Sequence, residues 1–188
     1  MTAPPFQDVV RDLSPSLRSY FERMVGDPVT AEDLLQESLI KISKGLATFE
    51  GRSSLRTWAY TIATRTAYDH FRRPDQRRNM VELDEANEPW DPHADISEAF
   101  IVEEMNACVR EVIDGLPEDY RAALVLHDLE GLTAQETADV CGTSLATAKA
   151  RIHRGRKRLE KALENACILY TENEILRCDR KEPAEDSS

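Results

Sequence analysis

The sequence lacks the features that would place it in a membrane or outside the cell. Its 188 residues contain no run of eighteen apolar residues, so we expect no transmembrane helix. The first thirty residues lack the basic, apolar and small-residue order of a secretory signal. We therefore expect a cytoplasmic protein that is not inserted in a membrane.

The sequence also lacks the usual signatures of enzymes and metal sites. None of its four cysteines stands in Cys-x-x-Cys spacing, so buried or free thiols are favoured over a zinc or disulfide frame. There is no glycine-rich phosphate loop, no metal-ligand spacing and no nucleophile–base pair. We expect no catalytic residue, no metal, no cofactor and no small-molecule substrate.

Positive charge is missing from one long segment. Between Asn79 and Val109 there are nine acidic residues and no Lys or Arg. This segment separates two basic blocks, Arg52–Arg78 and Lys149–Lys161, in a chain of net charge −11. Because the field of so acidic a protein repels phosphate, binding to nucleic acid without help is disfavoured. The local basic blocks nevertheless need an explanation.

Apolar residues recur at helical spacing on both sides of the acidic segment. A capping box at Thr30–Asp33 predicts the start of a helix that runs to Leu46, and a second helix is predicted from Leu55 until Arg73-Pro74. Beyond a linker at 79–97, helical patterns return at 96–113 and around 120–127. We expect an all-α fold of two small helical domains joined by an acidic flexible linker.

The second basic block has the pattern of a helix-turn-helix. A capping box at Leu132–Glu136 starts a short helix that ends at Cys141-Gly142, and Thr143 or Ser144 caps the basic helix that follows. The basic helix has almost no Glu at i±4 to offset its charge, which favours binding to a phosphate backbone. The alternative is an ordinary solvated helical face.

Several sequence motifs follow one another in a fixed order. The first half of the chain contains Ala31-Glu-Asp-Leu-Leu-Gln-Glu37, Phe49-Glu-Gly-Arg-Ser-Ser-Leu-Arg-Thr-Trp58 and Asp69-His-Phe-Arg-Arg73. The second half contains Leu116-Pro-Glu-Asp-Tyr-Arg121 and Glu130-Gly-Leu-Thr-Ala-Gln-Glu136 with the basic helix. Over roughly residues 8 to 163 these motifs resemble domains two and four of the extracytoplasmic-function (ECF) sigma factors of the sigma-70 class.

The resemblance implies a transcription initiation factor that binds core RNA polymerase and promoter DNA, helps to open the duplex and is restrained by an anti-sigma factor. The resemblance also implies that this factor is not an enzyme. The implied organisation is domain two at 1–78, the linker at 79–97, domain four at 98–166 and a C-terminal tail at 167–188. The alternatives are a stand-alone helix-turn-helix repressor and an adaptor that binds polymerase only.

Three groups of site residues follow from the resemblance. The polymerase-binding residues are Asp33, Leu34, Gln36, Glu37 and Lys41. The residues for the minus-ten element are Gly51, Arg52, Ser53, Ser54 and Arg56. The residues for the minus-thirty-five element are Thr147, Lys149, Ala150, Arg151, His153 and Arg154.

Each group also has a plainer interpretation. The polymerase-binding group could be an ordinary solvent-exposed helical face with a Glu37–Lys41 pair, and the minus-ten group could be a simple helix connector. Core packing is favoured over base stacking for Trp58 because of its spacing with Leu55 and Ile62. Gly155 stands where the family commonly has alanine, and a glycine inside a helix costs about 0.5–1 kcal/mol.

Two interpretations remain for Cys167–Cys178. One extends the basic helix and is favoured by the spacing of Leu159, Leu163 and Tyr170. The other is a hairpin turning at Glu172-Asn173, which would place the two cysteines opposite each other, able to form a disulfide or half of a zinc site.

Overall fold

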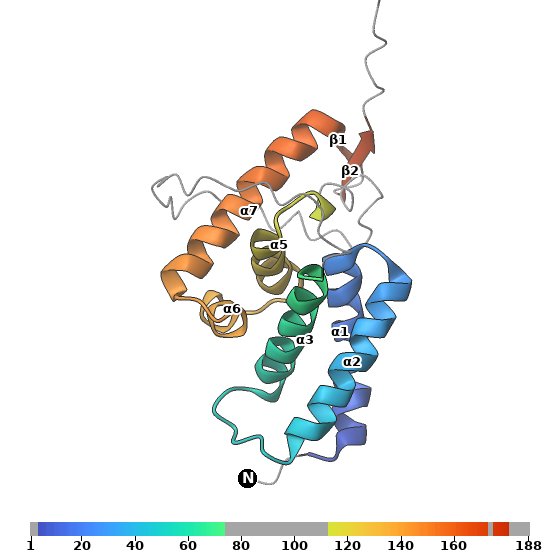
Figure 1. The fold of residues 1–188 in the computed structure, drawn as a ribbon. Coiled ribbons are helices and arrows are strands. Elements are labelled where there is room, and N and C mark those ends of the chain that lie inside the picture. The colour runs from blue at the N-terminus through green and yellow to red at the C-terminus, as the bar shows by residue number, and fades with distance from the viewer. Residues whose placement is uncertain (1–3, 74–112, 173–174, 181–188) are drawn as a thin grey trace, which may run out of the picture.

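A computed structural model describes residues 4–73, 113–172 and 175–180. Their elements in chain order are α1 (Phe6–Val25), α2 (Pro28–Leu46), α3 (Leu55–Phe71), α5 (Glu118–Leu124), the π-helical turn η2 (Val125–Leu129), α6 (Ala134–Cys141), α7 (Leu145–Ala166), β1 (Cys167–Glu172) and β2 (Ile175–Arg180). The predicted linker at 79–97 and nearly all of the helix at 96–113 lie outside the described residues. The largely helical fold is confirmed (Figure 1).

Side-chain caps account for where the helices begin. Thr133 and Glu136 form the predicted capping box of α6, and Ser54 caps α3 by accepting the Thr57 N–H. The predicted start of α2 at Thr30 is wrong. The helix begins at Pro28, because Asp27 Oδ2 accepts the Thr30 N–H at 2.8 Å and proline suits the first helical position.

Helix α1 is absent from the sequence-based prediction. Pro15 lies inside it, where proline removes a backbone hydrogen bond and normally disfavours a helix. The helix persists because Leu17, Phe21 and Met24 are fully buried on its inner face. Tertiary burial thus outweighs the local preference.

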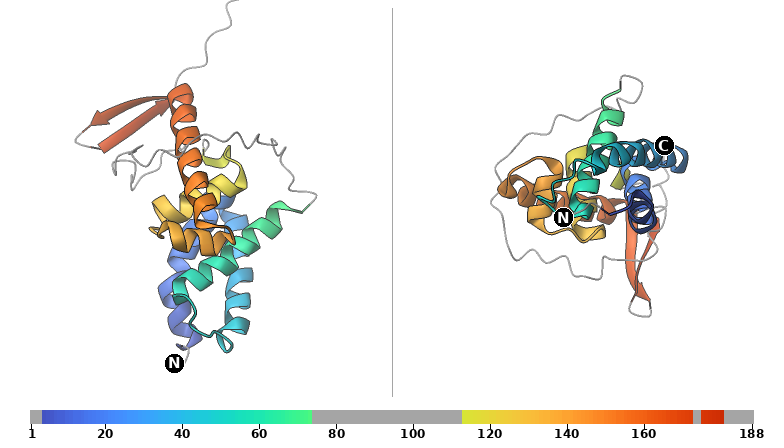
Figure 2. Two further views of the ribbon diagram at one scale, coloured as in Figure 1. Left: turned by 90° about the vertical axis from the view of Figure 1, so that its left-hand side faces the viewer. Right: turned by 90° about the horizontal axis from the view of Figure 1, so that it is seen from below.

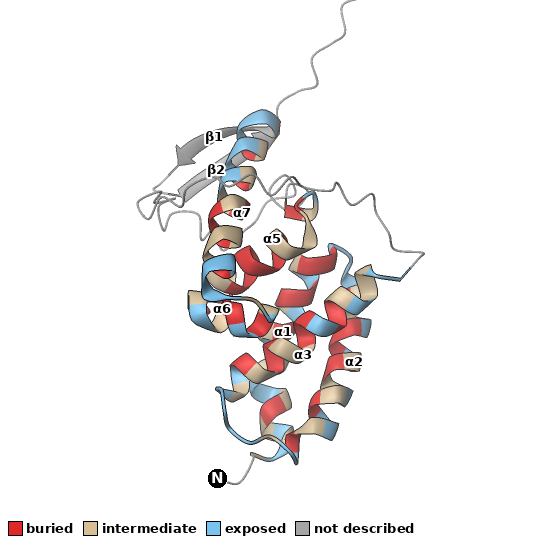
Figure 3. Cartoon of the chain, turned by 60° about the vertical axis from the view of Figure 1, so that its left-hand side comes forward, coloured by how far each residue is buried: buried red, intermediate tan, exposed pale blue. Residues whose placement is uncertain are grey.

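Helices α1, α2 and α3 form the first unit, and α5, η2, α6 and α7 form the second (Figure 1). In the first unit the buried Tyr20 hydroxyl shares a hydrogen bond of 2.9 Å with Thr64 Oγ1. Its ring meets that of Tyr60 edge to face, with centroids 5.5 Å apart. Buried residues follow the helix sides that face one another (Figure 3).

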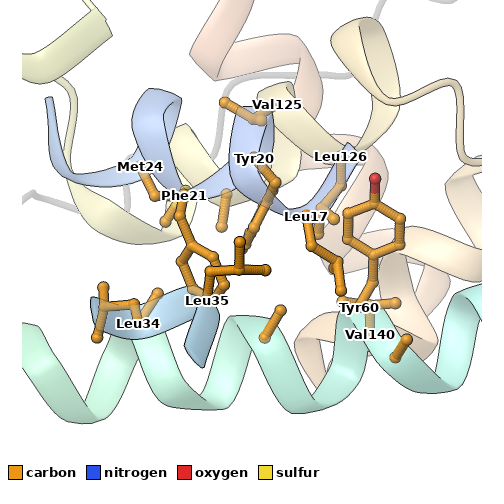
Figure 4. Packing of buried hydrophobic residues seen from close by; sticks show 14 of the residues in the cluster. Leu17, Tyr20, Phe21, Met24, Leu34, Leu35, Tyr60, Val125, Leu126 and Val140 are labelled. Atoms are coloured by element: carbon orange, nitrogen blue, oxygen red, sulfur yellow. The ribbon is translucent and has the colours of Figure 1, made fainter. Parts of the chain in front are cut away.

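The two units share one hydrophobic cluster. Val125, Leu126 and Val140 of the second unit belong to the same cluster as Leu17 and Tyr60 of the first. Figure 4 shows these side chains together, with α3 running below them. Helix α3 is therefore covered by α1 and α2 on one side and by α6 on another.

The predicted helical extension of α7 is wrong, because a β-hairpin follows Ala166. Strands β1 and β2 pair antiparallel, with Cys167 opposite Arg180 and Leu169 opposite Cys178. The alternative prediction placed Cys167 directly opposite Cys178. The observed register does not, so this part of the alternative prediction is wrong. The hairpin projects from the end of α7 (Figure 2). Within the described residues, no helix combines the length and apolar character needed to cross a bilayer.

Two glycines of the second unit should respond oppositely to alanine. At Gly155, inside α7, an added Cβ would sit 3.4 Å from Leu124 Cδ1 and from the Tyr120 carbonyl oxygen, which is ordinary contact. Gly155→Ala should therefore raise the free energy of unfolding by about 0.5–1 kcal/mol.

Gly142 ends α6 with a φ of 65°, so Gly142→Ala should lower the free energy of unfolding by roughly 1–2 kcal/mol, although nothing lies near its Cβ position. Urea unfolding of both variants measures the two effects. If both substitutions changed the free energy of unfolding in the same direction, the explanation would be wrong. It states that Gly155 has room for a methyl group, whereas Gly142 is required for its backbone conformation.

Candidate nucleic-acid and protein-binding surfaces

The outward face of α2 carries most of the residues predicted to bind polymerase. Asp33 and Gln36 are exposed, while Glu37 and Lys41 are half-buried. Lys41 Nζ lies 2.8 Å from Glu37 Oε1 and donates to Thr66 Oγ1 of α3 at 3.0 Å. The Glu37–Lys41 pair, expected if this is an ordinary solvent-exposed face, is therefore present. Asp33 and Gln36 are the most exposed members of the group.

Leu34 does not belong to this face. Its side chain is only 3% exposed and lies in the hydrophobic core, because position 34 turns toward α1 and α3 rather than toward solvent. The prediction that Leu34 contacts a partner is wrong in this arrangement. Ile40, which the prediction missed, is 55% exposed between Gln36 and Lys44. Its signal in the sequence is an apolar residue on the polar side of the helix.

The loop between α2 and α3 presents the residues predicted for the minus-ten element. Gly51, Arg52, Ser53 and Ser54 are all exposed. Gly51 has a φ of 70° and no atom within 4 Å of its Cβ position, so the backbone there is open to close approach. Ser54 also has the structural task of capping α3.

Arg56 is separated from this group by its contacts. Its guanidinium donates to the backbone carbonyl of Glu130 in the second unit and lies 5.4 Å from the centre of the Tyr60 ring. Trp58 packs against Phe49 with ring centroids 5.1 Å apart and borders the core. The favoured prediction of core packing for Trp58 is confirmed.

Helix α7 follows a turn at Gly142 and is capped by Ser144, whose Oγ accepts the Thr147 N–H at 3.1 Å. Ala148, Ile152, Gly155 and Leu159 form its buried stripe. The opposite side of the helix carries a stripe of exposed and half-buried residues, which are Thr147, Ala150, Arg154, Lys157 and Lys161. The last two were not among the predicted site residues, although they continue the same stripe at helical spacing.

His153 was predicted to contact the minus-thirty-five element, but the structure buries it. The folded chain covers its side chain, which is 9% exposed, so the ring cannot reach a base edge in this arrangement. Its Nε2 atom is buried and makes no hydrogen bond within the described part of the chain. Lys149, on the same side of α7, is half-buried.

Acidic residues of the preceding helix segments neutralise part of the basic helix. Arg151 Nη2 lies 2.7 Å from Asp119 Oδ2. Arg156 forms a two-pronged pair with Asp128, including a bond of 3.0 Å from Nε to Oδ2. The lack of Glu at i±4 along the basic helix therefore does not leave its charge without compensation inside the protein. The compensating acids come from α5 and η2, which sequence spacing along α7 cannot reveal.

Chemistry at the cysteines is limited where the structure describes them. Burial raises the pKa of the Cys141 thiol to about 11, so the reactive thiolate is scarce at neutral pH. Within the described residues, no three His, Cys, Asp or Glu side chains gather where they could hold a metal ion.

The surfaces on α2, on the α2–α3 loop and on α7 are suited to binding macromolecules.

Two family models match this chain, one on each unit. The sigma-70 region 2 model matches residues 9–78, and the sigma-70 region 4 model matches residues 106–159. The two matches fall on the parts of the chain that contain α1 to α3 and α5 to α7, respectively.

Curated relatives and one solved structure agree with these matches. The RNA polymerase sigma-H factor of Pseudomonas aeruginosa is 36% identical over 149 residues, 76% of this chain and 77% of the relative. The ECF RNA polymerase sigma factor SigX of Bacillus subtilis is 35% identical over 147 residues, 75% of this chain and 74% of the relative. A similar fold occurs in the sigma factor RpoE of Bartonella quintana, solved with the anti-sigma factor NepR, with a TM-score of 0.66, 25% identity and coverage of 85% and 96%.

Asp128 should matter more for stability than Asp119. The Asp128 side chain is 21% exposed and holds Arg156 with two hydrogen bonds, whereas Asp119 is 49% exposed and holds Arg151 with one. Asp128→Asn should lower the free energy of unfolding by about 1.5–3 kcal/mol, and Asp119→Asn by about 1 kcal/mol or less. Urea unfolding compares them, and equal losses would refute the ranking.

Proposed function

Because this chain belongs to the ECF sigma factors of the sigma-70 family, we propose that it binds core RNA polymerase, directs it to specific promoters and assists duplex opening. The observation that carries the proposal is the succession of region 2 and region 4 matches in one chain, each on its own helical unit. Relatives named as ECF RNA polymerase sigma factors support the same assignment.

The polymerase docks on the outward face of α2. Asp33 and Gln36 supply polar contacts at its centre, and Ile40 supplies the apolar contact, since a large exposed apolar residue within a polar rim is typical of an interface. Glu37 and Lys41, which already pair with each other, complete the rim of this surface.

Promoter DNA contacts two separate surfaces. The loop from Gly51 to Ser54 approaches an unpaired base of the minus-ten element, where an open glycine and serine hydroxyls allow close contact. Arg52 at the loop and Arg56 beside it take the neighbouring phosphates. The stripe of α7 containing Thr147, Ala150 and Arg154 enters the major groove of the minus-thirty-five element, and Lys157 and Lys161 extend its contact with phosphate.

The protein acts in the cytoplasm as an initiation factor and performs no enzymatic step itself. A similar structure holds a sigma factor with its anti-sigma factor, and we extend that kind of partner to this chain. An anti-sigma factor would control it by covering the surfaces named above.

Run-off transcription tests the function directly. Purified core RNA polymerase with fragmented genomic DNA should give discrete new start sites only when this protein is added, and these starts should share two spaced upstream elements. Absence of new starts, together with tight duplex binding by the protein alone, would overturn the proposal in favour of a stand-alone repressor.

Replacing Ile40 tests the polymerase surface. Ile40→Ala should weaken binding to core polymerase about tenfold or more, because burying an isoleucine side chain contributes about 1.5–3 kcal/mol. Glu22→Ala, exposed on α1, is the matched control and should bind as the wild type does. Affinity measured by fluorescence anisotropy of the labelled protein decides this, and an unchanged Ile40→Ala variant would exclude Ile40 from the interface.

A further inference from the structure

Glu130 joins the two units of the molecule. It follows η2 in the second unit, and its side chain is 5% exposed. The carboxylate accepts a hydrogen bond of 2.7 Å from Arg23 Nη1 of α1 and one of 2.5 Å from the Tyr60 hydroxyl of α3. Arg56 of α3 donates to the Glu130 backbone carbonyl and lies 4.0 Å from the carboxylate. These three groups all belong to the first unit.

The protonation state of Tyr60 suits this contact. Burial and the hydrogen bond to Glu130 raise the pKa of Tyr60 to about 12, so the phenol keeps its proton at neutral pH and donates to the carboxylate. A buried carboxylate is costly unless it is paired and hydrogen-bonded. Glu130 is therefore stable in its position only while the first unit is docked against it.

Other contacts extend the junction around Glu130. Thr57 Oγ1 donates to Glu136 Oε1 of α6 at 3.3 Å, and Arg121 of α5 donates to the Met24 carbonyl at the end of α1. Leu126 and Val140 add apolar contact beside Tyr60 (Figure 4). Together these contacts bury the side of α3 that carries Thr57 and Tyr60, and they engage Arg56.

The proposed function requires the protein to contact two distant promoter elements at the same time. The inference rests on this requirement, and the closed arrangement conflicts with it. Elements centred near positions minus ten and minus thirty-five lie about 85 Å apart along B-DNA, so two units in direct contact cannot reach both. Residues 74–112 could span at most about 140 Å when fully extended, which is enough once the units separate. The junction must therefore open before both elements are bound.

We propose that Glu130 is an autoinhibitory latch, which holds the free protein closed by binding Arg23, Arg56 and Tyr60 and is released when the protein engages polymerase and promoter DNA. In the closed form the Glu130 backbone carbonyl, with the carboxylate 4.0 Å away, engages the Arg56 guanidinium that the proposed function assigns to a DNA phosphate. Phosphate and Glu130 therefore compete for the same guanidinium.

Small-angle scattering and DNA binding of the free full-length chain test the latch. Wild type should have a radius of gyration near the compact value of about 16 Å for this length. Glu130→Gln should increase it by several ångströms. Its affinity for a labelled 30-base single-stranded DNA of random sequence should rise about tenfold, as expected if the open form is a tenth populated in the wild type.

Glu22→Gln is the matched control, because it makes the same change of charge at an exposed position of α1 beside Arg23. It should leave the radius of gyration unchanged and alter DNA binding only slightly. If Glu130→Gln disturbs the folding of the second unit, Arg23→Gln and Tyr60→Phe carry the test, since both leave that unit unaltered. Each should open the protein to a smaller extent.

Unchanged dimensions and DNA affinity in Glu130→Gln, Arg23→Gln and Tyr60→Phe would overturn the latch. Neither measurement depends on transcription, so the two proposals can fail separately. Wild type that supports transcription while all three variants stay closed would exclude the latch alone. Variants that open while the wild type supports no transcription would exclude the proposed function alone.

Discussion

The buried carboxylate of Glu130 is the contact on which the arrangement of this molecule depends. A charged group in an apolar surrounding requires partners, and the partners present are Arg23 and Tyr60 from the opposite unit. The surrounding cluster, including Leu126 and Val140, excludes water and strengthens these interactions. Polar pairing and apolar packing therefore stabilise the same docked arrangement.

Charge pairing also explains how an acidic protein accommodates a strongly basic helix. Asp119 of α5 and Asp128 of η2 pair with Arg151 and Arg156, so these two arginines fix α7 in its place within the second unit. The outward stripe carries Arg154, Lys157 and Lys161, which are fewer than the seven basic residues found between Lys149 and Lys161. A helix can thus carry high positive charge for two separate purposes, support and binding.

Local rules predicted the parts of the fold that depend on neighbours in the chain. The capping box of α6, the glycine turn before α7 and the serine cap of α3 all follow from short-range hydrogen bonding. The failures have a common physical cause. Helix α1 survives Pro15 because distant residues bury its inner face, and the hairpin after Ala166 competes with a helical pattern that local spacing favours. Leu34 and His153 were misplaced because exposure depends on what packs over a helix.

The sequence by itself determined the family, the helical class, the turn and helix of the second unit and the polar face of α2, because motif order and periodicity lie within short stretches of chain. Only the tertiary structure decided that the two units share one core and that α3 is covered on two sides. It also decided which basic residues are paired with aspartates. These features join residues as far apart as Tyr60 and Glu130, and such contacts depend on packing geometry that no local pattern encodes.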